Sequence, residues 1–158
     1  MGVARLPDVP DSSVPQDRRA ARVLLVDAAD RVLLLHGSDP TTPERGRWWI
    51  TPGGGLEPGE APASAAAREL REETGLDVDA AALGEPVHAR TTEFHFLGHH
   101  VLQSEDYFLL RVQAHDVATD TPDPGITGHR WWPLGELPGT AEQVFPAELH
   151  DLLTGLLA

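Results

Sequence analysis

Three glutamates lie close together in the sequence, with a spacing that would bring their carboxylates to one side of a helix. Successive helical residues turn by about 100°, so with Glu69 at zero, Glu73 lies at about +40° and Glu72 at about −60°. Oxygen ligands on one rigid face are what a hard divalent cation such as Mg²⁺ or Mn²⁺ prefers. The chemistry that this pattern indicates is therefore metal binding by carboxylates.

The same spacing is also typical of a helix face that is merely solvated. Exposed acids three and four residues apart repel each other by roughly 0.2–0.5 kcal/mol per pair. Arg68 and Arg71 lie near enough on the same helix to offset part of that repulsion. Taken alone, the three glutamates do not decide between a metal site and a surface of intrahelical salt bridges.

A glycine-rich segment directly before the acidic stretch favours the metal site. Residues 53–60 read Gly-Gly-Gly-Leu-Glu-Pro-Gly-Glu. Glycines let the backbone approach a ligand closely and turn its amides and carbonyls toward it. A turn held at the foot of an acidic helix can bring a carbonyl oxygen to the same cation, although a flexible turn without a ligand also fits the glycines alone.

The elements that must hold these groups follow from the pattern of apolar residues. Residues 62–74 predict a helix, because Pro62 suits its first turn, strong helix formers follow, and Gly75 suits its C-terminal cap. Two apolar runs, at 20–26 and 31–36, surround a short polar break and predict a hairpin of buried strands.

The rest of the chain alternates between predicted strands and loops and ends in a helix. Phenylalanines and aliphatic residues keep a period of two in 84–97 and 107–114, and a polar connection rich in His, Gln and Ser joins these two strands. Further strands are expected at 48–51 and 128–132, and leucines at helical spacing predict a helix at 146–157. The predicted fold class is α/β, a mixed β-sheet between helices.

At this point the residues resemble the Nudix box of the MutT-like Nudix hydrolases. The resemblance is sharp over residues 48–76 and looser elsewhere, and it implies a Nudix-type α/β/α sandwich that hydrolyses a nucleoside diphosphate linked to another group. The matching positions are Gly54, Glu60, Arg68, Glu69, Leu70, Glu72, Glu73, Gly75 and Leu76, with Trp49, Pro52 and Gly53 upstream.

By this resemblance, Glu69, Glu72 and Glu73 would hold divalent ions, Mg²⁺ with Mn²⁺ as a substitute, and the Gly53 carbonyl would be a further ligand. Cleavage of a diphosphate needs charge neutralised on both phosphoryl groups and a water deprotonated near neutral pH, and metal ions supply both. One box glutamate, Glu69 by preference, would take the proton of that water.

Other box residues would act through the glutamates rather than on the substrate. The resemblance implies that Arg68 orients one of the glutamates through a salt bridge. Glu60 would brace the loop against the helix, and Gly54 and Gly75 would be structural.

Family members often add an acid from a loop outside the box. Glu105 is our first candidate for a further metal ligand, and Glu93 is the second. Both lie near His95, His99 and His100, a combination that also suggests a transition-metal site. Exposed histidines at a turn are the simpler interpretation.

Substrate contacts are expected from arginines, which bind phosphate in a bidentate manner, and from tryptophans, on which a base can stack. The candidates are Arg47, Trp49, Arg90 and Trp131. Arginines of this kind are more often surface residues, and such tryptophans are more often core or interface residues.

The expected substrate is a small nucleotide-type molecule, with nucleoside triphosphate pyrophosphohydrolysis of the MutT type as the leading hypothesis. The alternatives are a pyrophosphatase for ADP-ribose, another nucleotide sugar or a dinucleoside polyphosphate, and a catalytically silent nucleotide-binding module.

The composition excludes several other functions. The 158 residues contain 12 basic and 25 acidic residues, a formal net charge of −13. This acidity argues against sequence-independent nucleic-acid binding and against docking on anionic lipid. The sequence contains no cysteine, which excludes a thiolate nucleophile and a cysteine-ligated zinc site.

The same overview gives the expected organisation. No apolar run approaches a membrane span, and no signal-peptide pattern begins the chain, so a cytoplasmic protein is expected. Residues 1–19, rich in proline and without apolar periodicity, predict a flexible N-terminal arm, and residues 20–158 predict a single domain. A monomer and a homodimer both remain open.

Overall fold

Two strands rich in aliphatic residues form the centre of the protein, whose computed structural model describes residues 14–119 and 123–158. They are β1 (Gln16–Val26) and β2 (Arg31–Ser38). Residues 20–26 of β1 are all buried, as expected for a strand covered on both faces. The other strands are β3 (Arg47–Ile50), β4 (Gly53–Gly55), β5 (His88–Phe96), β6 (His99–Arg111), β7 (Ile126–Pro133) and β8 (Gln143–Phe145).

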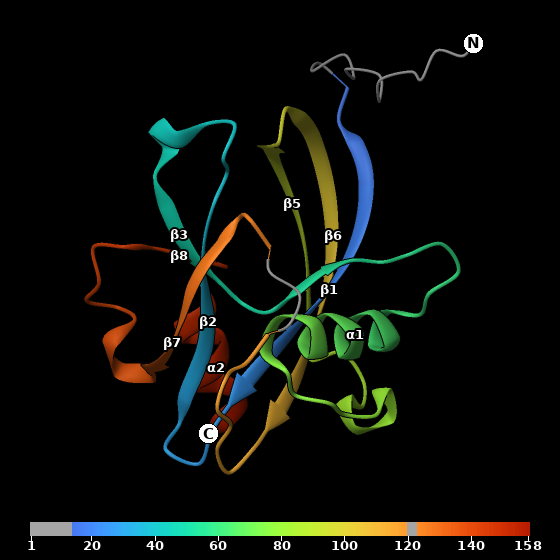
Figure 1. The fold of residues 1–158 in the computed structure, drawn as a ribbon. Coiled ribbons are helices and arrows are strands. Elements are labelled where there is room, and N and C mark those ends of the chain that lie inside the picture. The colour runs from blue at the N-terminus through green and yellow to red at the C-terminus, as the bar shows by residue number, and fades with distance from the viewer. Residues whose placement is uncertain (1–13, 120–122) are drawn as a thin grey trace.

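The described strands form one mixed sheet in the order β5-β6-β1-β2-β3-β8, with β4 paired to β1 and β7 paired to β2. β1 runs parallel to β6 and β3 runs parallel to β8, while the other pairs are antiparallel. β1 and β2 pair at Val26 and Val32 and then diverge, as Figure 1 shows. The divergence divides the sheet into two halves, β1-β4-β5-β6 and β2-β3-β7-β8.

Two helices cover opposite faces of the sheet. They are α1 (Pro62–Thr74) and α2 (Leu149–Leu157), and Figure 1 shows α1 in front of the sheet and α2 behind it. Each helix closes its own apolar cluster, with Leu70 of α1 in one and Leu149 and Leu153 of α2 in the other. The structure is therefore the α/β/α sandwich that the resemblance implies.

The helix predicted at 62–74 is confirmed as α1. Pro62 occupies its first turn, and Gly75 ends it with φ of 77°, in the left-handed region that favours glycine. The hairpin predicted at 20–36 is confirmed as β1 and β2. The predicted terminal helix is shorter than expected, since α2 begins at Leu149 rather than at 146.

One predicted loop is wrong. The polar stretch expected to connect two strands is the first half of β6, and the hairpin turns at Leu97 and Gly98 instead. This segment is a strand because Gln103 and Glu105 alternate inward and are buried despite their polarity. Its neighbours β1 and β5 satisfy its backbone hydrogen-bonding groups on both sides.

The boundary of the predicted N-terminal arm is also wrong. Residues 16–19 are the beginning of β1 and pair with residues 101–104 of β6. Their side chains are largely exposed, so backbone pairing rather than burial places them in the sheet. Residues 1–13 of the predicted arm lie outside the described residues.

Short 3₁₀ helices connect several of the strands, and none of the described helices is long and apolar enough to cross a membrane. The 3₁₀ segments are η1 (Pro43–Arg45), η2 (Ala80–Leu83) and η3 (Leu134–Glu136).

The packing of α1 gives a first prediction. Leu70 is fully buried between α1 and the sheet, so Leu70→Ala is expected to lower the free energy of unfolding by about 2–5 kcal/mol. Urea denaturation measures the loss. Leu97→Ala removes the same atoms from a side chain that is 45% exposed and serves as the control. An equal loss in both variants would contradict the packing described here.

Candidate active site

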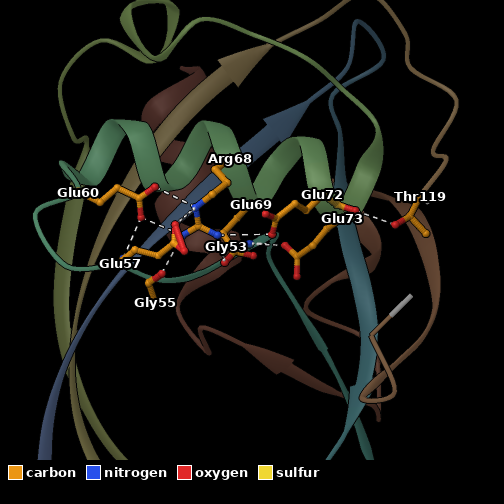
Figure 2. Close-up of polar contacts among 9 residues, drawn as sticks. All are labelled: Gly53, Gly55, Glu57, Glu60, Arg68, Glu69, Glu72, Glu73 and Thr119. Carbon is orange, nitrogen blue, oxygen red and sulfur yellow. Dashed lines mark hydrogen bonds and ion pairs between the residues drawn. The ribbon is translucent and has the colours of Figure 1, made fainter. Parts of the chain in front are cut away.

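The acidic side of α1 faces the glycine strand β4. Leu70 and its buried neighbours on α1 pack against the sheet and thereby fix the rotation of the helix about its axis. Glu69, Glu72 and Glu73 then lie on the side of the helix that borders β4, as Figure 2 shows. One helix and one short strand therefore gather the three predicted ligands beside Gly53.

β4 consists of glycines because side chains there would collide with neighbouring groups. A Cβ on Gly54 would lie 2.6 Å from Oε1 of Glu69, and a Cβ on Gly53, whose φ is 149°, would lie 2.3 Å from the carbonyl oxygen of Ala21. Only glycine lets the strand pass so close to both neighbours. The positions of Glu69 and β1 therefore require glycine in β4.

The guanidinium of Arg68 connects the loop before α1 to the acidic side of the helix. Its Nε and Nη2 donate to the two carboxylate oxygens of Glu60, both at 2.9 Å. Its Nη1 donates to Oε1 of Glu69 at 3.0 Å and to Oε2 of Glu72 at 3.4 Å. Nη2 also donates to the carbonyl oxygen of Gly55 at 3.0 Å.

Glu60 braces this loop. It accepts a hydrogen bond of 2.9 Å from the backbone N–H of Glu57 in addition to the two from Arg68. These hydrogen bonds, first those of Arg68, lower the pKa of Glu60 to about 2, and the Glu60 contacts raise the pKa of Arg68. The contacts expected of Arg68 and Glu60 from the resemblance are therefore present.

Glu73 and Glu69 lie where partial burial disfavours their charged forms. Oε1 of Glu73 accepts a hydrogen bond of 2.8 Å from the backbone N–H of Gly53. Burial nevertheless raises the pKa of Glu73 to about 8, and the charges of Glu69 and Asp123 add to the increase. Burial also raises the pKa of Glu69, against the opposing effect of Arg68.

The chemistry of these residues fits a divalent cation. Buried carboxylates with raised pKa values are stabilised by a nearby positive charge, and oxygen donors are what Mg²⁺ prefers. Within residues 14–119 and 123–158, no three acidic or histidine side chains already converge as metal ligands. Glu69 and Glu72 point instead to Arg68, which a cation would have to replace as their partner.

The glycine strand and the acidic helix lie inside a longer match to a known family. The NUDIX domain model matches residues 16–152. The chain belongs to the Nudix family. It is accordingly a hydrolase of phosphoanhydride bonds.

Individual relatives have different names, and the chain spans different shares of their lengths. The chain is 34% identical to the RNA pyrophosphohydrolase of Pseudomonas fluorescens (strain SBW25), over 70% of this chain and 79% of that protein. A 45% identical match to an octanoyltransferase of Myxococcus xanthus covers 48% of this chain and only 22% of that protein. The MutT protein of Methanosarcina mazei Go1 has the same fold, with a TM-score of 0.66 at 20% identity, over 89% of this chain and 93% of that one.

A second group of charges in this Nudix protein surrounds Glu105, on the face of β1 and β6 that α2 covers. Glu105 is 4% exposed. Nε of Arg22 lies 2.9 Å from Oε2 and Nε of Arg90 lies 3.0 Å from Oε1. Gln103 and Tyr107 donate further hydrogen bonds at 2.8 and 3.0 Å. Burial opposes ionisation of Glu105, but the Arg22 charge and these donors lower its pKa overall.

The ion pair of Arg22 and Glu105 supports the backbone that leads into β4. Nη1 of Arg22 donates to the carbonyl oxygen of Thr51 at 3.0 Å, two residues before Gly53. We expected Glu105 to offer a metal ligand from a loop, but it lies in β6 and four donors already occupy its two oxygens. These contacts favour a role in positioning the strand.

The four predicted substrate contacts lie in separate places in the Nudix protein. Arg47 is exposed at the start of β3, and Arg90 is bound to Glu105. Trp49 is buried in the cluster under α2, where its Nε1 donates to Glu142 at 3.0 Å. Trp131 packs on the cluster under α1, on the opposite face of the sheet.

The histidines do not form the metal site considered above. The rings of His95 and His100 stack with centroids 4.4 Å apart, and Nε2 of His100 lies 2.6 Å from Oε2 of Glu93. The part of the chain that the structure describes contains no group of three or more metal-binding side chains here.

Sequence reasoning missed Arg18, Arg22 and Asp123. Arg22 carried a readable signal, because a charged residue inside an otherwise apolar buried run needs a buried partner. Arg18 was assigned to the N-terminal arm, and its place beside β4 depends on the pairing of β1 with β6. Nothing local distinguishes Asp123 from the other acids.

Glu73 gives a prediction on stability and pH. Its folded-state pKa of about 8 exceeds the ordinary value of 4.5, so its stabilising contribution is complete below about pH 4.5 and is lost as the pH rises through 8. Glu73→Gln removes this dependence. In EDTA, the Tm of the variant should exceed that of the wild type at pH 9, and the difference should shrink toward pH 5. Glu72→Gln is the control, and a less stable Glu73→Gln at pH 9 would contradict the burial argument.

Glu105 gives a prediction that separates a structural role from metal ligation. Glu105→Gln leaves the buried Arg22 without its carboxylate partner, which should cost about 3 kcal/mol in the free energy of unfolding. Urea denaturation measures this loss. The Mg²⁺ concentration for half-maximal activity should stay within about twofold of the wild-type value, since removing even an indirect contact to a metal typically costs about 10–100-fold. A Mg²⁺ requirement that rises tenfold or more would contradict a role that is only structural.

Proposed function

We propose that the protein is a divalent-metal-dependent pyrophosphohydrolase that acts on a nucleoside diphosphate derivative, with nucleoside triphosphates as the leading substrate. The observation that carries the proposal is the pair of half-buried carboxylates, Glu69 and Glu73, whose pKa values are raised beside a strand of bare backbone. Ionisation of these carboxylates costs stability unless a cation lies near them.

The proposed ligands of Mg²⁺, or of Mn²⁺ in its place, are Glu69, Glu72, Glu73 and the carbonyl oxygen of Gly53. The bound ions would neutralise phosphoryl charge and make a water acidic enough to lose its proton near neutral pH. Glu105 is left out of this set because its oxygens are already bonded to Arg22 and its neighbours.

The chain's own residues would divide the remaining work. Glu69 is our preferred acceptor for the proton of the attacking water, because burial raises its pKa and no described residue donates to its Oε2. Arg68 would hold Glu69 in place through the 3.0 Å hydrogen bond, and Glu60 would hold Arg68. The backbone N–H of Gly53 would keep Glu73 directed at β4.

A second candidate is removal of pyrophosphate from the 5′ end of RNA. It is supported by the 34% identity with an RNA pyrophosphohydrolase over 79% of that protein. Both reactions cleave the same kind of bond in a 5′-triphosphate. They differ in whether a further nucleotide must be accommodated, and ADP-ribose, other nucleotide sugars and dinucleoside polyphosphates remain alternatives for the assay.

The proposal predicts hydrolysis that depends on metal and on Glu72. The panel comprises nucleoside triphosphates, oxidised nucleotides, ADP-ribose, dinucleoside polyphosphates, and 5′-triphosphate and capped RNA, each with Mg²⁺ or Mn²⁺. Ion-exchange chromatography should detect inorganic pyrophosphate and a monophosphate from the nucleoside triphosphates. EDTA should abolish turnover, and added Mg²⁺ should restore it.

Glu72→Gln should lower kcat/KM by at least about 100-fold, more than is typical for a residue that only orients a ligand. Its side chain is 36% exposed, so the variant should fold. Asp77→Asn, an exposed acid just beyond α1, is the matched control and should leave turnover unchanged. Turnover that survives EDTA or the loss of Glu72 would overturn the proposal, as would no turnover of any substrate.

A further inference from the structure

A hollow lies on the side of β1, β5 and β6 that carries Glu105. Its volume is about 410 Å³, and it is bordered by Arg18, Phe94, Phe96 and Val101. The register of the sheet places these side chains on one face, because Phe94 pairs with Val101 across β5 and β6. The hollow is thus part aromatic and part cationic.

Arg18 lies between this hollow and the acidic helix. A Cβ on Gly55 would lie 2.7 Å from Nη2 of Arg18, while a Cβ on Gly54 would lie 2.6 Å from Oε1 of Glu69. Adjacent residues of a strand face opposite sides, so Arg18 and Glu69 flank β4 with only glycine backbone between them. A ligand that extends from the carboxylates past this strip would meet Arg18 next.

An amide, rather than a carboxylate, holds the guanidinium of Arg18 in place. Its Nη1 donates to the amide oxygen of Gln103 at 2.8 Å, and Nε2 of Gln103 donates to Glu105 at 2.8 Å. Among the described residues, Arg18 makes no ion pair with an acid. The side chain is exposed, so an anion can reach the guanidinium and pair with it.

The other charges near Arg18 also favour an anionic ligand. Two carboxylates lie near the three arginines of this face. The carboxylates are Glu105 and Glu148, and the arginines are Arg18, Arg22 and Arg90. Among these five side chains positive charges exceed negative ones by one, in a protein whose formal net charge is −13. Asp17 also borders the hollow, but it alternates with Arg18 and belongs to the other face of β1.

We propose that Arg18 binds a phosphate of a nucleotide whose base lies in the hollow against Phe94 and Phe96. A guanidinium recognises phosphate through paired hydrogen bonds, and an aromatic ring offers a base a stacking surface. The inference rests on the proposed function, because that function places the substrate's diphosphate at the glutamates of α1 and so extends the rest of the substrate toward Arg18. Its chemistry, a phosphate next to a base, holds for any nucleoside phosphate.

The test uses probes that have no phosphoanhydride bond to cleave. AMP and GMP, together with adenosine and guanosine, are titrated into the full-length protein by isothermal titration calorimetry. At least one monophosphate should bind about tenfold more tightly than its nucleoside. Arg18→Gln should abolish that difference and leave nucleoside affinity unchanged.

Two further variants separate charge from stacking. Arg19→Gln removes an arginine from the same strand, one that faces the other side near Asp106, and should bind the monophosphate as the wild type does. Phe94→Leu should weaken the binding of both monophosphate and nucleoside. Thermal unfolding checks that each variant is folded.

The outcomes distinguish this site from the proposed reaction. If no substrate is hydrolysed but monophosphate binding depends on Arg18, the proposed function fails and the site stands. If a nucleotide is hydrolysed and Arg18→Gln leaves its KM unchanged, the site fails and the proposed function stands. Absence of monophosphate binding, or equal losses in Arg18→Gln and Arg19→Gln, would overturn the inference.

Discussion

The guanidinium of Arg68 is the contact on which the arrangement of the candidate site depends. One planar group reaches the loop through Glu60, the glycine strand through Gly55 and the helix through Glu69. An arginine presents five N–H donors in a fixed plane, whereas the ammonium group of a lysine is a compact point charge without that geometry. Its Nη1 also donates to both Glu69 and Glu72 and so offsets part of the repulsion between them. Structural support and charge balance thus come from a single side chain.

The glycine strand is the second constraint, and it acts through what it lacks. Because β4 carries no side chains, α1 can approach β1 closely, and Glu69 can lie against the backbone. The strip also separates two regions of opposite charge, the glutamates of α1 on one side and Arg18 with its neighbours on the other. A diphosphate compound would fit this arrangement. Cations held by the glutamates would meet its phosphates on one side of the strip, and Arg18 would meet them on the other.

Local signals in the sequence were enough to predict the acidic helix and most of its surroundings. The limits of α1 follow from Pro62 and Gly75, and the spacing of the glutamates follows from helical geometry alone. The first half of β6 could not be read in this way, because its strand character depends on neighbours far away in the sequence. The same holds for Arg18, whose partner Gln103 is 85 residues distant. Trp49 and Trp131 look alike in the sequence, and only the sheet register places them on opposite faces.

The parallel pairing of β1 with β6 has a consequence for the order in which the protein can be built. A ribosome releases the whole segment from β1 to α1 before it has made β6, so the acidic helix and the glycine strand emerge while Arg22 still lacks Glu105. Contacts of such long sequence separation carry a large loop-closure cost and slow folding. Until Glu105 has left the exit tunnel, Arg22 in the centre of the future core lacks its carboxylate partner. For part of its synthesis, the chain therefore contains the whole glycine strand and acidic helix but cannot yet form the complete sheet.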